Sequence, residues 1–192
     1  MSPKLRRGSA LTRIVFGAAL LITLLAGWWI VSRTSAANPL VEALPGQANR
    51  SSVKSAVHLY FGDAQGRYLV AEQRIVDKPV GEAAFAAQLI GDLIGGPTQG
   101  ATRTLPVEAR LDAIYVTAAG VAYVDFAANS FFSHPGGIGA ELLSIYSIVN
   151  TLVLNVDGIR SVKFLIGGRE AATLAGHADL QAPFEVDMLW VR

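Results

Sequence analysis

An uncharged apolar run near the start of the chain limits what this sequence can become. Residues 14–31, IVFGAALLITLLAGWWIV, contain no charged side chain. At about 1.5 Å per residue, a helix of this length crosses a bilayer core of roughly 30 Å. The run therefore predicts a transmembrane anchor or a signal segment, with a separately folded part after it.

The charges that flank this run predict its orientation. Positive side chains precede it at Lys4, Arg6, Arg7 and Arg13. Only Arg33 follows it closely. Because positive charge is retained on the cytoplasmic side, residues 1–13 are expected to form a cytoplasmic basic N-terminus, and the remainder to be exported. Trp28 and Trp29 lie at the far end of the run, where indole rings favour the membrane interface, and they argue for a retained single-pass anchor.

Cleavage of the segment is the alternative. Small residues such as Thr34 and Ala36 follow the run and resemble those before a signal-peptide cleavage site. The run is nevertheless longer than the roughly 7 to 15 apolar residues of a typical signal-peptide core. The chain has no cysteine, so neither a lipid anchor on an N-terminal cysteine nor thiolate chemistry is available.

The segment between the anchor and the domain has the composition of a tether. Residues 32–52 contain prolines, a glycine and small polar residues without a clear period, which predicts a flexible linker. From residue 53 onward, ten Lys and Arg stand against fourteen Asp and Glu, a net charge of −4. A domain of this sign has no electrostatic basis for binding nucleic acid.

Hydrophobic periodicity predicts alternating strands and helices in residues 53–192. Period-two runs predict one hairpin over VHLYF and YLVAEQRIV, and a second over LDAIYVT and VAYVDF. Helical spacing predicts one helix that stops at Gly95-Gly96-Pro97 and another from near Ile138 to Val156. SVKFLIGG and FEVDMLWVR predict further strands. The order indicates an α+β domain with a mostly antiparallel sheet and two main helices packed on one face of it.

The polar face of the second predicted helix is a candidate interaction surface. It carries small uncharged groups, among them Ser144, Ser147, Thr151 and Asn155. Such groups allow close approach of another molecule with little desolvation of charge. The ordinary alternative is a solvated helix face. If the surface binds a partner, these four residues are the predicted contacts.

Several stretches, taken in order, resemble the GerMN domain of spore germination and sporulation proteins. They are VHLYF with YLVAEQR, LIGDLIGGPTQG, TLPVEARLDAIYV, VAYVDFAANSF, ELLSIYSIVNTL and VKFLIGGREAATLAGHADLQAPF. Together they cover roughly residues 55–184. The resemblance implies a compact α+β domain similar to the ring-building motifs of bacterial envelope assemblies, usually membrane-anchored or carried by a lipoprotein, and not known as an enzyme. A single copy of the domain is present here, and the lipoprotein cysteine is missing.

The segment Gly176-His177-Ala178-Asp179-Leu180 contains the pair most suggestive of chemistry. His177 with Asp179 would serve catalysis only beside a nucleophile or a metal. The sequence contains no G-x-S-x-G elbow and no H-E-x-x-H pair, while His58 and His134 stand isolated along the chain. Asp and His tolerate turn geometry, and an Asp side chain accepts loop amides, so the pair is predicted to hold a turn.

Two other motifs are predicted to be structural. Gly136-Gly137-Ile138-Gly139 precedes a helix, where free amides attract anions, but the phosphate-binding fingerprints are absent and a sharp glycine turn accounts for it. Asp125 and Asn129 offer oxygen ligands, yet an Asp that ends a strand and a capping Asn need no ion. No cofactor and no metal are therefore expected.

These observations favour a non-enzymatic envelope protein, held in the bacterial cytoplasmic membrane with its N-terminus inside and its domain extracytoplasmic or periplasmic. The domain would bind another envelope protein or its own copies, through the second helix or an open sheet edge. The alternative is a module for cell-wall glycan, such as peptidoglycan, or a small ligand. Its candidate aromatic platform is Tyr115, Tyr123, Phe131 and Phe132. A hydrolase using His177 is a third hypothesis.

Overall fold

The computed structural model describes residues 53–192. The predicted N-terminus at 1–13, anchor or signal segment at 14–31 and linker at 32–52 lie outside the described residues. The domain contains the hairpins and both main helices that the periodicity predicts.

The first hairpin consists of β1 (Val53–Gly62) and β2 (Leu69–Lys78), paired antiparallel over their whole length. Val57, Leu59 and Phe61 alternate along β1 and are buried, which is the period-two pattern of a strand with one face on the core. The carboxylate of Asp63 closes the turn by accepting the amides of Arg67 at 2.7 Å and Tyr68 at 3.3 Å.

Helix α2 (Glu82–Gly95) follows the hairpin. Its core face carries Phe85, Leu89 and Leu93, each at most 1% exposed. The helix ends where the sequence predicts, because Gly96 has a φ of 89°, a conformation that other residues rarely adopt. Arg103 donates to the last carbonyls of the helix, those of Ile94 and Gly95, at 2.6 Å each.

The second sheet is mixed. It contains β3 (Leu111–Val116), β4 (Val121–Phe126), β5 (Ser161–Ile166) and β6 (Arg169–Glu170) in that order, and β7 (Phe184–Glu185) also pairs with β5. β3 and β4 form the predicted antiparallel hairpin, whereas β4 and β5 are parallel. The prediction of a mostly antiparallel sheet was therefore wrong. Helix α3 (Ile138–Asn155) carries the chain from the end of β4 back to the start of β5, and such a crossover makes the two strands parallel.

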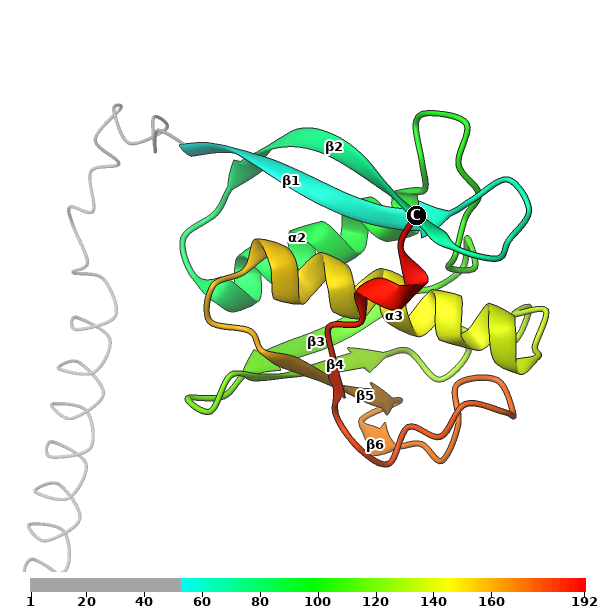
Figure 1. The fold of residues 1–192 in the computed structure, drawn as a ribbon. Helices are drawn as coiled ribbons and strands as arrows, with labels where there is room; N and C mark the ends of the chain where they lie inside the picture. Colours follow the sequence, from blue (N-terminus) through cyan, green and yellow to red (C-terminus); the bar gives the residue numbers. More distant parts are fainter. Residues whose placement is uncertain (1–52) are drawn as a thin grey trace, which may run out of the picture. The chain divides into compact units, whose positions relative to one another are not determined.

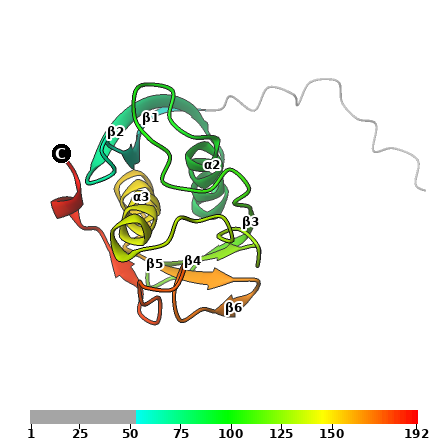
Figure 2. The same ribbon diagram turned by 90° about the vertical axis from the view of Figure 1, so that its right-hand side faces the viewer.

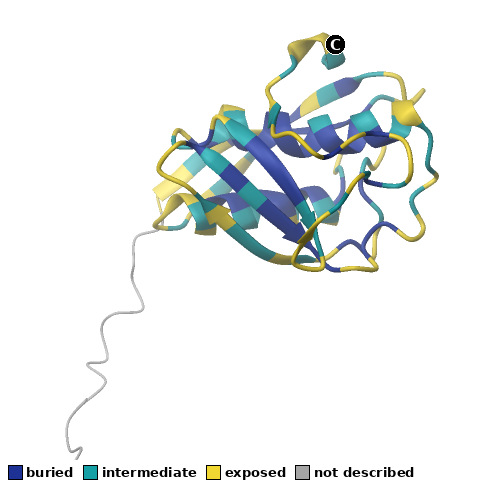
Figure 3. Ribbon diagram, turned by 90° about the horizontal axis from the view of Figure 1, so that it is seen from below, coloured by how far each residue is buried: buried dark blue, intermediate teal, exposed yellow. Residues whose placement is uncertain are grey.

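The helices lie between two β layers. Figures 1 and 2 show the β1–β2 hairpin on one side of α2 and α3 and the mixed sheet on the other. The prediction that both helices pack on one face of a sheet is correct for the mixed sheet. It did not include the β1–β2 hairpin, which covers the opposite side of the helices. The buried residues run along the helices and the strands, and the exposed ones gather in the loops (Figure 3).

The C-terminal segment crosses α3 on its way back to the hairpin. A short 3-10 helix, η1 (Met188–Trp190), replaces most of the predicted final strand. Asn150 holds this segment through a reciprocal pair of hydrogen bonds, with its Nδ2 at 2.9 Å from the carbonyl of Asp187 and its Oδ1 at 3.1 Å from the amide of Asp187. Trp190 stacks on Tyr146 with ring centroids 5.7 Å apart.

Among the described residues, one helix, α3, is long and apolar enough to span a membrane by length and composition alone. In this domain it is a core helix instead. Ile145, Ile148, Val149 and Leu152 are at most 1% exposed, between the hairpin and the mixed sheet. Its hydropathy therefore reflects burial on both sides, which is typical of a central helix.

Candidate functional site

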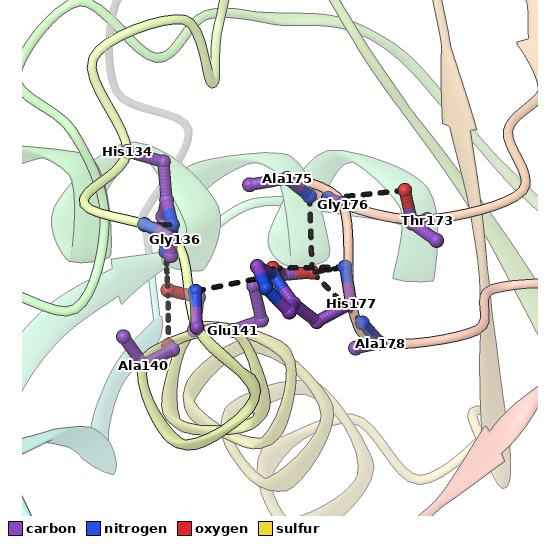
Figure 4. Close-up of polar contacts among 11 residues, drawn as sticks. His134, Gly136, Ala140, Glu141, Thr173, Ala175, Gly176, His177 and Ala178 are labelled. Carbon is purple, nitrogen blue, oxygen red and sulfur yellow. Dashed lines mark hydrogen bonds and ion pairs between the residues drawn. The ribbon is translucent and has the colours of Figure 1, made fainter.

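The loop that contains His177 is held to α3 by one buried carboxylate. Glu141, in the first turn of α3, is 0% exposed. Its oxygens accept the backbone amides of Ala175 at 3.0 Å, His177 at 3.1 Å and Ala178 at 2.9 Å. Figure 4 shows these amides converging on the carboxylate. Glu141 was not among the residues predicted from the sequence to form a site, although a single acid on an otherwise uncharged helix face was a usable signal.

The ring of His177 contacts Glu141 and not Asp179. His177 Nδ1 lies 2.7 Å from Glu141 Oε1, and the rest of the histidine side chain is largely exposed. Asp179 accepts the amide of Gln181 at 2.8 Å, which confirms the prediction that its carboxylate holds a loop turn. Burial raises the pKa of Glu141, but the amides of Ala178 and Ala175 and the His177 ring outweigh it and hold that pKa below its usual value. Glu141 is therefore ionised at neutral pH, and the amide of Gly137 approaches the same His177 Nδ1 at 3.2 Å.

A second histidine lies beside a serine, and the direction of its hydrogen bonds decides what the pair can do. The amide of Gly136 donates to His134 Nδ1 at 3.0 Å, so in the neutral ring Nε2 carries the hydrogen. That Nε2 lies 2.9 Å from Ser144 Oγ and donates to it, while Ser144 donates onward to the carbonyl of Thr104. A base that activates serine must accept its proton, and here the bond runs the other way.

The same pair lines a cavity of about 230 Å³ between α3 and the loop that follows α2. Arg103, Thr104 and Leu105 contribute to its walls. Burial lowers the pKa of His134, and the charge of Glu141 offsets this only in part, so the ring stays neutral at pH 7. The cavity thus offers a neutral histidine and an engaged hydroxyl, which is the arrangement of a structural hydrogen-bond network.

The other residues considered for chemistry have structural partners. Asp125 Oδ1 accepts the amide of Gly168 at 2.9 Å and so closes the turn between β5 and β6. Gly136 and Gly137 have φ values of 73° and 85°, which explains the glycines before α3 as a sharp turn. Within residues 53–192, no group of three or more His, Cys, Asp or Glu side chains is placed to hold a metal ion.

The predicted interaction face of α3 is turned inward, so its placement on the surface was wrong. Ser144, Ser147 and Thr151 are at most 1% exposed, and Asn155 is only partly exposed. Ser147, Thr151 and Asn155 face the outer edge of β1, the edge that does not pair with β2, whereas Ser144 bonds to His134 and Thr104. The side chains of Ser147, Thr151 and Asn155 bond to the backbone of β1, and they occupy the position beside it that a third strand would otherwise take.

Three of the four residues make these bonds. Tyr60 N donates to Thr151 Oγ1 at 3.2 Å, and Ser147 Oγ donates to Tyr60 O at 2.5 Å. Asn155 makes a reciprocal pair with His58, accepting its amide at 3.0 Å and donating to its carbonyl at 2.8 Å. At His58 and Tyr60 the outer edge of β1 is thus closed from within the chain.

The outer edge of β2 is open. Because the backbone groups of His58 and Tyr60 point away from β2, the alternation of an antiparallel ladder makes those of Ala71, Gln73 and Ile75 point away from β1. Among the described residues, none of these three has a backbone partner beyond the hairpin, and all three are exposed. Ile75 is 63% exposed. An exposed strand edge is one of the contact surfaces that the sequence predicts, and in the described residues β2 carries such an edge on the outside.

The four aromatic candidates are only partly brought together. Tyr115 and Tyr123 are directly opposite each other on β3 and β4, and Tyr115 is 63% exposed. Phe131 is 7% exposed and packs edge-on against Phe126 with centroids 5.2 Å apart, so it belongs to the core. Phe132 is 84% exposed in the loop before α3. The platform is therefore reduced to a tyrosine pair on one sheet.

Solved structures define the class of this domain. The first GerMN domain of the sporulation protein GerM from Bacillus subtilis has 22% identity and a TM-score of 0.55, with 70% of this chain and 98% of that chain covered. The tandem GerMN domains of the same protein have 23% identity and a TM-score of 0.56, and the match covers 71% of this chain and 47% of that chain. A predicted lipoprotein from Clostridium perfringens has 21% identity and a TM-score of 0.50, and the match covers 69% of this chain and 87% of that chain. The fold is therefore that of a GerMN domain.

The sequence itself assigns the family. The profile of the Germane family, described as sporulation and spore germination, matches residues 58–172. This chain belongs to that family. A search of curated protein sequences found no match.

Proposed function

We propose that this protein is a membrane-anchored component of the bacterial cell envelope whose GerMN domain binds protein, either a partner or its own copies, without catalysing a reaction. The observation that carries the proposal is the open edge of β2. The role belongs to a sporulation or germination type of process, as the description of the Germane family suggests.

The open edge supports binding because its backbone groups are ready to pair. Natural sheets protect their edges, since an exposed row of N–H and C=O groups recruits other strands. Thr151 and Asn155 protect β1, whereas within residues 53–192 no comparable group covers β2 at Ala71, Gln73 and Ile75. A partner strand added at β2 would gain main-chain hydrogen bonds from the backbone and specificity from the flanking side chains.

The location follows from residues outside the described domain. The uncharged run at 14–31 and the positive residues before it favour a single-pass anchor in the cytoplasmic membrane with the N-terminus inside. The similarity to a predicted lipoprotein agrees with a domain held at a membrane. Secretion after cleavage of the segment is the alternative.

Photo-crosslinking in the native cell tests the proposal. A photoreactive residue at Gln73 is expected to give a discrete heavier band. The exposed control is Val107, 70% exposed in a loop, and the buried control is Ser147, at 0%. An adduct at Gln73 that is absent at both controls would support binding at the edge. Equal labelling at Gln73 and Val107, or no adduct at Gln73, would contradict it.

Glycan binding is the second candidate, and the tyrosine pair favours it. Tyr115 and Tyr123 oppose each other across β3 and β4, so their rings share one face of the sheet. Core residues of β4 such as Val124 face the helices, which puts the tyrosines on the opposite face. Co-sedimentation of the full chain with purified peptidoglycan, compared with a Tyr115→Ala/Tyr123→Ala variant, tests it. Equal sedimentation of the two proteins would remove this candidate.

A further inference from the structure

The open edge of β2 is limited at one end by the chain itself. Arg192 N donates to the carbonyl of Leu69 at 2.9 Å, and Val191 lies beside Leu69 in a parallel bridge. These last residues therefore occupy the edge at Leu69, and the outward-facing groups that remain open run from Ala71 to Ile75. A long strand would collide with Val191 and Arg192, so the edge suits a short extended segment.

A groove of about 540 Å³ lies beside this part of the edge. Residues 70–73 of β2 form one wall, and loop residues 99–101 form another, where Gly100 and Ala101 leave room because their side chains are small. The amide of Gln99 donates to the carboxylate of Glu72 at 3.2 Å, so the loop lies on the Glu72 face of β2. Side chains of an added strand alternate between two faces, and those on the Glu72 face would point into the groove.

The loop wall of the groove is fixed to the hairpin at both ends. The carboxylate of Glu72, a residue that is 7% exposed, accepts the amide of Thr98 at 2.9 Å as well as that of Gln99. Thr102 pairs with Gly62 through two backbone hydrogen bonds, at 2.7 Å and 2.9 Å. Because both walls are already in place, little conformational entropy is lost in the groove when a segment docks.

The charge of the groove comes from Asp63. The carboxylates of Asp63 and Glu72 both line it, whereas none of the described residues around it is a lysine or an arginine. Arg74 neutralises Glu72 through an ion pair at 2.6 Å. The amide of Arg67 lowers the pKa of Asp63, which is therefore ionised at neutral pH; the side chain of Arg67 attracts it as well but does not line the groove. A cationic side chain in the groove would complement this negative charge.

The other face of the edge favours apolar side chains. Ala71, Gln73 and Ile75 alternate with Glu72 along β2 and therefore point away from the groove. Ile75 is 63% exposed. An apolar residue directly opposite it on an added strand would cover it and stabilise the strand pair.

From this geometry we infer that the β2 edge binds a short extended segment of another protein, which places a lysine or arginine side chain in the groove beside Asp63. The alternate side chains of the segment are apolar and cover the Ile75 face. This inference rests on the proposed function, since it specifies the partner that occupies the same edge.

Fluorescence anisotropy with the full chain in detergent micelles tests the inference. The probes are a labelled peptide, Val-Lys-Val-Thr-Val, and its counterpart Val-Glu-Val-Thr-Val, and the reversed sequence of each covers both chain directions. In the favoured direction the lysine peptide is expected to bind at least about threefold more tightly than the glutamate peptide, the size of effect that a solvent-accessible charge pair gives. The preference should shrink as salt is added, because salt screens such a pair.

Variants of the full chain locate the source of the preference. Asp63→Asn keeps an oxygen that can accept the amides of Arg67 and Tyr68 but removes the charge, so the preference should disappear with little change in thermal melting. The matched control is Asp179→Asn, which alters a turn outside the groove and should retain the preference. Gln73→Pro should weaken the binding of both peptides, since proline removes the central N–H of the edge.

Any of four results would overturn the inference. They are equal binding of the two peptides, a preference that survives Asp63→Asn, binding that Gln73→Pro leaves unchanged, and no binding of either peptide. The photo-crosslink at Gln73 then decides the proposed function separately. An adduct there, with a partner or with a second copy, would retain the function without the inference, and the absence of any adduct would remove both.

Discussion

The two edges of the β1–β2 hairpin differ in how their backbone groups are satisfied. On β1, the outward groups of His58 and Tyr60 bond to Asn155, Thr151 and Ser147 of α3. On β2, the outward groups at Ala71, Gln73 and Ile75 have no such partner among the described residues. A helix thus replaces a neighbouring strand on one side only. The difference shows that the polar face of α3 is an internal support, and it directs the search for a binding surface to β2.

The same helix face extends this support to the C-terminal loop through Glu141, and removing that carboxylate is expected to have the largest effect. Glu141→Gln removes a charge on which the amides of Ala175, His177 and Ala178 converge in a site with no solvent. The free energy of unfolding should fall by about 2 to 4 kcal/mol, because Gln leaves some of these buried amides without an acceptor. Chemical denaturation of the full chain measures it, with the exposed Glu185→Gln as control, expected to lie within about 0.5 kcal/mol of the unaltered protein.

The pH dependence of the same variant has a defined sign. The pKa of Glu141 is lower in the folded domain than its ordinary value of 4.5. Its contribution is therefore fully present above pH 4.5 and is lost as the pH falls through the folded pKa. Between neutral and acid pH, the stability of Glu141→Gln should decline less than that of the unaltered protein. An equally steep decline would show that this carboxylate does not carry the acid sensitivity.

Breaking one bond at the closed edge of β1 should have the next largest effect. Thr151→Val keeps the shape of the side chain but leaves the buried amide of Tyr60 without its acceptor. The expected loss is about 1 to 3 kcal/mol of unfolding free energy, the cost of an unsatisfied buried donor. Thr117→Val, in the exposed turn between β3 and β4, is the control. If Thr151→Val were as stable as the unaltered protein, α3 would not be supporting the β1 edge.

Proline substitutions compare the two edges directly. His58 and Gln73 both direct their N–H away from the hairpin partner, but only the His58 N–H is bonded, to Asn155. His58→Pro should lower the unfolding free energy by about 1 to 2 kcal/mol, whereas Gln73→Pro should change it by less than about 0.5 kcal/mol. Thermal melting of both variants measures the difference. Equal destabilisation would mean that the β2 edge is not open in the folded domain.

The smallest effect is expected at Asp179. Asp179→Asn retains an oxygen that can accept the amide of Gln181, so the loss should not exceed about 1 kcal/mol. The adduct formed in cells at Gln73 should be unchanged, because Asp179 lies in the C-terminal loop. Loss of that adduct with an unchanged melting curve would point to a functional role for Asp179 that the turn does not explain.

The sequence was sufficient for the two main helices and the two hairpins. Helical spacing placed α3 at Ile138 with an end within one residue of that observed, and Gly95-Gly96-Pro97 marked the end of α2. These signals are local, because backbone propensity and capping act over a few neighbouring residues. The role of Asp179 as a turn residue was predictable for the same reason.

The direction of the polar face of α3 was not predictable from that face alone. An amphipathic pattern shows which residues share a side, and polar residues usually face water. Here the chain folds a distant hairpin over them, so that Ser147 bonds to Tyr60 across 87 positions. Small hydroxyl and amide groups can be buried at low cost when they find backbone partners, and that condition depends on the approach of β1.

The sequence by itself determined the positions of the two main helices and of the two hairpins, the GerMN resemblance and the absence of thiol chemistry, because these depend on periodicity, ordered motifs and composition. Only the tertiary structure decided that β4 and β5 run parallel, that Glu141 is the partner of His177 and that β2 carries the open edge. Each of these results depends on groups far apart in the chain coming together. A one-dimensional pattern specifies which groups need partners, and the packed fold determines which partners they find.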